Sequence, residues 1–143
     1  KFLGCNISSA TKEVLCQPGY DDAHLLIPGA PYDMVIYYAE EIAVRSDRTK
    51  TNIRNLATTE FGEGVNVEPE AEFVFLVRKV FTDAELRMLG LEYMAVLHAK
   101  IEGGAILNQL LSRQKGGDPW VQPWLIDQNV PWEGRGGFVF PFA

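Results

Sequence analysis

Histidine and cysteine are scarce in this 143-residue chain, which holds two of each, and the scarcity limits its chemistry. A structural zinc site needs four ligands, and the sequence offers no second pair of Cys or His at metal spacing. Asp21, Asp22 and His24 stand close together, but a turn with solvated carboxylates explains them better than a metal site. We therefore expect neither a metal nor a cofactor.

Recognisable catalytic motifs are also missing. No Gly-x-Ser-x-Gly elbow is present, and the glycines of segment 133–137 lack the Lys-Ser or Lys-Thr of a phosphate-binding loop. His98 alone could ligate a pigment, although a lone His is usually structural. A carboxylate pair for acid–base catalysis could come from Glu60, Glu63, Glu68, Glu70 and Glu72, but a solvated acidic segment is the simpler interpretation. We expect the chain not to be an enzyme.

Long apolar runs are absent, and so is an excess of positive charge. The best apolar stretch is interrupted by Glu92, His98 and Lys100, so we expect no membrane span. The net charge of −6 opposes non-specific binding to nucleic acid. The sequence leaves the localisation open.

The apolar pattern predicts an α+β fold in which a small sheet packs against one long helix and one or two shorter ones. The alternation of Phe73 to Phe81 predicts a central strand, and Thr82 and Glu85 form a capping box that begins a buried helix. A strand through Met34 to Tyr38 competes with one of the predicted helices. The predicted strands are 23–27 and 73–81, and the predicted helices are 32–45, 52–58, 83–101 and 105–113.

The last quarter of the chain holds all three tryptophans, each preceded by proline. Proline removes an N–H and fixes φ, so this segment cannot be helical and would make a poor central strand. We expect a globular domain over 1–117 and an extended, irregular aromatic arm over 118–143. The rings either cover the chain's own core or dock on a neighbouring subunit. The expected interface residues are Trp120, Trp124, Trp132, Phe138, Phe140 and Phe142.

Four of the thirteen basic residues fall within ten positions. Such a cluster could bind an anion or an acidic protein surface, and nucleic acid only through this local patch. A solvated helix face is the competing interpretation. The four residues are Arg45, Arg48, Lys50 and Arg54.

No motif is specific enough to name a family, so the functional expectation rests on the aromatic arm and the basic cluster. We expect a non-enzymatic structural or assembly subunit of a large protein complex, with a viral or phage capsid as the first instance. Its partners would be protein subunits, either copies of itself or other chains. One alternative is a module that holds a small ligand, carbohydrate or pigment on the arm. A second is a small enzyme with a carboxylate acid–base site.

Overall fold

The structure, a computed structural model, describes residues 33–98, 108–112, 121–124 and 130–142. Within these ranges five strands form one sheet, and helices pack against it, so the fold is α+β as the sequence predicts. The strands are β1 (Asp33–Tyr38), β2 (Tyr93–Val96), β3 (Asn108–Ser112), β4 (Val121–Trp124) and β5 (Gly136–Phe142). The α-helices are α3 (Lys50–Phe61), α4 (Phe73–Val80) and α5 (Asp83–Met88), and the 3-10 turns are η1 (Ala39–Glu41) and η2 (Arg45–Asp47).

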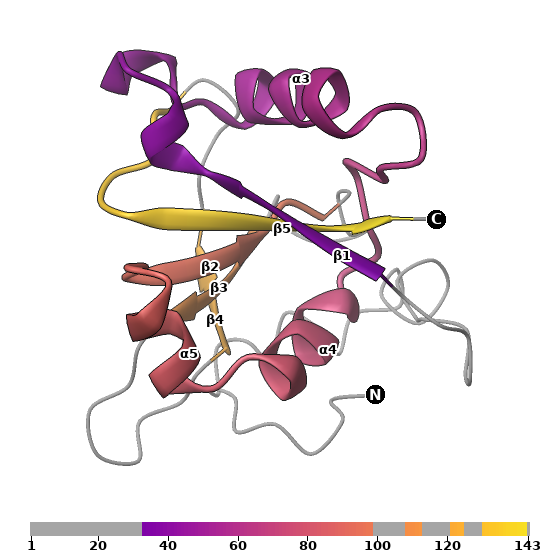
Figure 1. Cartoon of the computed structure of the whole chain (residues 1–143), viewed down its shortest axis with the longest axis vertical. Helices are drawn as coiled ribbons and strands as arrows, with labels where there is room; N and C mark the ends of the chain where they lie inside the picture. Colours follow the sequence, from indigo (N-terminus) through magenta and orange to yellow (C-terminus); the bar gives the residue numbers. More distant parts are fainter. Residues whose placement is uncertain (1–32, 99–107, 113–120, 125–129, 143) are drawn as a thin grey trace.

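The sheet lies between two helical layers. Helix α3 covers one face, and α4 and α5 cover the other (Figure 1). Each face carries its own apolar cluster, because side chains alternate between the two sides of a strand. The α3 face buries chiefly Tyr37, Ile53, Ala57, Tyr93, Ala95, Leu97, Trp132, Phe138 and Phe140, and the α4 face buries chiefly Phe73, Val74, Phe75, Val77, Leu86, Met94, Val96 and Val139.

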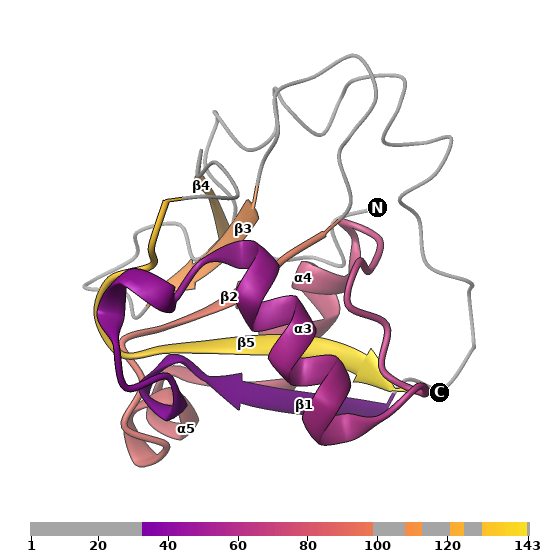
Figure 2. The same cartoon turned by 90° about the horizontal axis from the view of Figure 1, so that it is seen from above.

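The strands follow the spatial order β1-β5-β2-β3-β4. Strands β2 and β5 pair in parallel, and the other neighbours pair antiparallel. Strand β5 therefore lies inside the sheet, and β1 and β4 form its two edges (Figure 2).

The predicted helix over 32–45 is wrong in its described part, and the competing strand is correct. Residues 33–38 form β1, whose register places Val35 opposite Phe140 and Tyr37 opposite Phe138. The β-branched and aromatic content of this run suits a sheet with apolar layers on both faces. Helical turns appear only in the short η1 and η2 that follow.

The predicted strand over 73–81 is also wrong, because these residues form α4. A short run that is apolar on nearly every position fits a buried helix as well as a buried strand, and periodicity alone does not separate them. Helix α4 buries Phe73 to Phe75 together with Val77, and places Arg78 and Lys79 in its last turn, where cations favour the helix dipole.

The N-cap at Thr82 is confirmed, but the helix that it begins is much shorter than 83–101. The hydroxyl oxygen of Thr82 accepts from the Glu85 amide at 3.2 Å, as the motif predicts. Six residues later a Schellman motif ends α5: Gly90 has φ of +72°, and the Leu91 amide donates to the Leu86 carbonyl at 3.0 Å. Past this glycine, the helical spacing of Tyr93 and Val96 is coincidental, and both belong to β2.

The remaining helix predictions divide. The helix predicted over 52–58 is confirmed as α3, which begins two residues earlier and ends three residues later. The helix predicted over 105–113 is wrong in its described part, because 108–112 form β3. The strand predicted over 23–27, together with Asp21, Asp22, His24 and Trp120, lies outside the described residues.

The expectation that the aromatic tail makes a poor central strand is wrong for residues 136–142. Strand β5 lies inside the sheet, and Pro141 removes no hydrogen bond between β5 and β1. The Pro141 carbonyl accepts from the Asn66 amide at 2.9 Å, on the side away from β1. Because the N–H and C=O of one strand residue point to the same side, the missing Pro141 donor does not belong to the β1 ladder.

Candidate functional site

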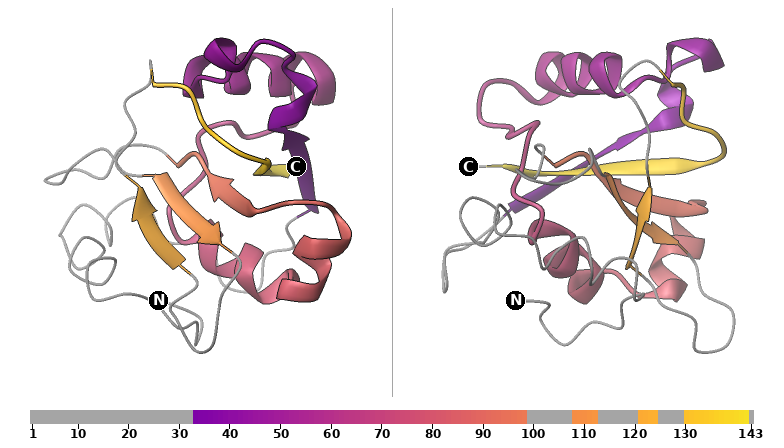
Figure 3. Two further views of the ribbon diagram at one scale, coloured as in Figure 1. Left: turned by 90° about the vertical axis from the view of Figure 1, so that its left-hand side faces the viewer. Right: turned by 180° about the vertical axis from the view of Figure 1, so that it is seen from behind.

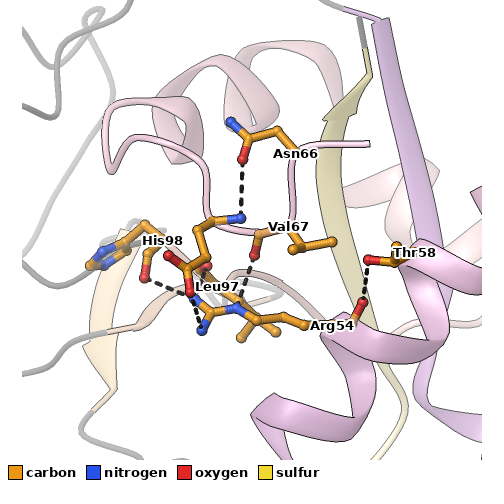
Figure 4. Close-up of polar contacts among 7 residues, drawn as sticks. Arg54, Thr58, Asn66, Val67, Leu97 and His98 are labelled. Carbon is orange, nitrogen blue, oxygen red and sulfur yellow. Dashed lines mark hydrogen bonds and ion pairs between the residues drawn. The ribbon is translucent and has the colours of Figure 1, made fainter. Parts of the chain in front are cut away.

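Of the four clustered basic residues, Arg54 makes the most of the hydrogen bonds described below, and its side chain points into the molecule. Its side chain is only 12% exposed. It donates to the carbonyl of Val67 at 2.9 Å and to those of Leu97 and His98 at 2.7 and 3.3 Å, and it pairs with Glu68 at 3.3 Å (Figure 4). Arg54 thus ties α3 to the segment after it and to the end of β2, which is a structural task.

Lys50 is buried as well, with 2% of its surface exposed at the start of α3. Burial is the main cause that lowers the pKa of its amine to about 8; the like charge of Arg54 lowers it further, and Glu68 opposes both. An amine in this position is closed to a large anionic partner.

The two remaining cations lie nearer the surface. Arg45 is 60% exposed and pairs with Glu133 at 2.6 Å, and the Arg48 side chain donates to the Ile42 carbonyl at 3.1 Å. The Arg48 carbonyl accepts from the Trp132 amide at 2.8 Å. The structure therefore does not bring the four cations onto one exposed surface, and the anion patch expected from their spacing is not formed.

Three aromatic rings pack together on the α3 face of the sheet. Trp132 stacks on Tyr93 with 5.8 Å between ring centroids, and its ring meets Phe138 edge to face at 5.3 Å. The Tyr93 hydroxyl donates to the Glu133 carbonyl at 2.8 Å, and burial raises its pKa. Gly136 makes room for this arrangement, because a Cβ there would overlap the Tyr93 ring.

The residues expected at a subunit interface therefore separate into groups. Trp132, Phe138 and Phe140 are fully buried in the chain's own core, so they offer no surface to a neighbour. Phe142 is half-buried at the end of β5, and the backbone of Trp124 ends β4. Of the two interpretations of the aromatic tail, packing within the chain is the one that these three buried rings follow.

The carboxylates of Glu41, at the end of η1, and Glu60, in the last turn of α3, interact with each other. The Glu41 and Glu60 side chains share a hydrogen bond, and burial, the Glu60 charge and this bond raise the pKa of Glu41. Burial and the same two acids raise the pKa of Tyr37. Two acids alone hold no metal, and no group of three or more His, Cys, Asp and Glu gathers within the described residues.

The free side of β1 is the feature that our sequence reasoning missed. The Pro141 carbonyl points away from β1. Met34 and Pro141, which lie opposite each other, therefore form a non-hydrogen-bonded pair of this ladder. The alternation then directs the N–H and C=O groups of Met34 and Ile36 outward, together with the N–H of Tyr38, whose carbonyl caps η1. Val35 and Tyr37 bond to β5. No described residue forms a hydrogen bond with these outward groups.

The side chains along this edge are apolar. Met34, Val35, Ile36 and Tyr38 are half-buried, packed against the two clusters beneath and above the sheet. Figure 3 shows β1 at the rim of the sheet, next to β5 and on the side of β5 away from β2. The outer edge of β1 thus presents backbone groups that bond to no described residue. Half-buried apolar side chains flank these groups on both faces of the sheet.

No helix in the described part of the chain has both the length and the apolar character that a membrane crossing requires. Comparison with known proteins gives no match, whether with protein-family models, with curated proteins or with solved structures.

Proposed function

We propose that this chain is a non-enzymatic assembly subunit that binds a neighbouring protein chain by strand addition along β1. The observation that carries the proposal is the outward row of backbone groups on Met34 and Ile36 and the Tyr38 N–H, which bond to no residue in the described part of the chain. An extended segment that docks on such an edge gains main-chain hydrogen bonds, and its alternate side chains contact both faces.

The composition of β1 supports an edge that is used rather than protected. Natural sheets protect exposed edges with Lys, Pro, bulges or inward-pointing charges, because an open edge promotes aggregation. The strand DMVIYY contains none of these devices, and its one charge, Asp33, stands at the end. Protein binding is the use that fits a bare apolar edge of this length.

In this proposal the aromatic tail supports the contact without making it. Phe138 and Phe140 are two of the β5 residues that bond directly to β1, and their rings are fully buried. They fix β1 at the edge of the sheet, so that its outward backbone groups are preorganised for a partner strand. A viral or phage particle remains a predicted setting for such a subunit.

The test uses a generic strand as probe, an acetylated and amidated Lys-Thr-Val-Thr-Val-Thr-Lys peptide. Hydrogen exchange of the full chain is followed by NMR with and without the peptide. We expect the amides of Met34, Ile36 and Tyr38 to exchange fast in the free protein and to slow on binding. The amides of Val35 and Tyr37 serve as internal controls, because β5 protects them in both states.

The opposite pattern would contradict the proposal. If the three outward amides are already protected in the dilute, unbound chain, the edge is closed by the chain itself. If the peptide binds but protects amides elsewhere, β1 is not the docking edge.

A further inference from the structure

We infer that the strand which β1 accepts is β1 of a second copy, in an antiparallel pair with Ile36 opposite Ile36 across a twofold axis. This inference rests on the proposed function and names its partner. The result is a single ten-stranded sheet built from two five-stranded ones, continuous through the dimer.

Backbone geometry limits the possible registers. In an antiparallel pair, outward-facing residues must meet outward-facing residues to exchange both hydrogen bonds. In β1 these are Met34, Ile36 and Tyr38. Pairing Ile36 with its own copy sets Met34 opposite Tyr38 at both ends, so all the outward groups are used.

The side chains match in the same register. On the α4 face, Met34 meets Tyr38 of the second copy and the two Ile36 side chains meet at the axis. On the α3 face, Val35 meets Tyr37. Aromatic and β-branched pairs of this kind stabilise antiparallel strands. Each face then continues an apolar cluster of one copy into the corresponding cluster of the other.

The two neighbouring registers pair fewer of the outward residues of β1. A shift of two residues in one direction leaves only Ile36 and Tyr38 opposite each other, and the shift in the other direction leaves only Met34 and Ile36. The register centred on Ile36 is the one that pairs all three.

The net charge also predicts how the dimer responds to salt. Each chain carries −6, and Glu40 and Glu41 follow directly after β1, with Arg135 at 3.9 Å from Glu40. Two acidic copies repel at low ionic strength, and salt screens that repulsion. Self-association through an apolar edge should therefore tighten as salt is added, whereas the capture of a basic partner strand would weaken.

Sedimentation equilibrium and spin-label distances test the inference together. The label is placed on the exposed edge residue as Asp33→Cys, in a full-length background carrying Cys5→Ser and Cys16→Ser. We expect a dimer that tightens from low to moderate salt. The proposed register separates the two Asp33 backbone positions by about 20 Å, against about 14 or about 27 Å for the shifted registers, at about 3.4 Å per residue.

The outcomes separate this inference from the proposed function. A chain that stays monomeric at all concentrations, yet binds the strand peptide through its outward amides, overturns the second copy and leaves strand addition intact. A dimer whose labels lie at a different spacing overturns the register. A chain that neither self-associates nor binds the peptide overturns both.

Discussion

The two edges of the sheet differ in how open they are to another chain. Strand β4 is four residues long and contains Pro123, which has no N–H to donate on either side. Strand β1 is six residues long, without proline, glycine or lysine, and its outward groups have no partner among the described residues. A protein that blocks one edge and leaves the other open directs pairing to the open one.

The open edge is also the better supported one. Strand β1 lies opposite β5 along all six residues, and β5 is buried over nearly its whole length. We therefore expect β1 to be rigid, because β5 pairs with its inner side. We expect it to accept another strand, because its outward groups bond to no described residue.

Phe140→Ala should have the largest effect, because it removes the buried ring that faces Val35 across the ladder. We expect a loss of about 3–5 kcal/mol in the free energy of unfolding, measured by urea denaturation. Hydrogen exchange should speed up in β1 more than in β4. The control is Leu56→Ala, at a partly exposed site on α3, which should cost far less. Equal loosening of both edges would contradict the claim that β5 holds β1.

Ile36→Lys should come next, and it acts on association rather than on folding alone. The two lysines would meet at the twofold axis, and like charges directly opposite destabilise strand pairing. We expect the dimer dissociation constant to rise by about tenfold or more, which corresponds to roughly 1.4 kcal/mol. The matched change on the other edge, Gln122→Lys in β4, should leave the dissociation constant unchanged. A weakening by Gln122→Lys of the same size would place the contact at β4.

Glu41→Gln should have the smallest effect, and its sign follows from the raised pKa. A carboxyl group that binds its proton more tightly when folded contributes stability that is present below its ordinary pKa of 4.5. That stability is lost as the pH rises through the raised folded value. Glu41→Gln should therefore flatten the pH dependence of the melting temperature in this window and slightly favour the dimer at neutral pH.

The matched control for this change is Glu63→Gln, which removes one exposed negative charge outside the Glu41–Glu60 pair. If both variants alter the pH profile equally, net charge and not the Glu41–Glu60 pair is responsible.

The fold class and the local capping signals were predictable from the sequence, and several element types were not. Thr82 and Glu85 form the expected cap, because capping depends on residues four positions apart or fewer. Phe73 to Val80 became a helix instead of a strand, because a short apolar run carries no decisive period. Gly90 was the available signal for the end of α5, since it follows the last helical turn as a Schellman glycine does.

The candidate site was harder to predict, because it is defined by pairing between distant segments. The sequence drew attention to the rings of Trp132 and Phe138, and their burial depends on Tyr93, some forty residues earlier. The sequence predicted that the cluster of basic residues lies on the surface. The Arg54 side chain instead donates hydrogen bonds to the carbonyls of Val67 and Leu97 inside the molecule. The open side of β1 depends on which strand lies next to β5, and a single sequence does not contain that order.

The most direct test compares Tyr38→Pro with Tyr38→Ala by sedimentation at increasing protein concentration. Both variants lose the ring, but only proline removes the outward N–H. Tyr38 has φ of −87°, close to the angle that proline adopts, and its N–H lies outside the β5 ladder. Strand addition at β1 predicts that Tyr38→Pro dimerises about tenfold or more weakly than Tyr38→Ala, since two hydrogen bonds are lost per dimer. Equal dissociation constants for the two variants, with both chains folded, would contradict it.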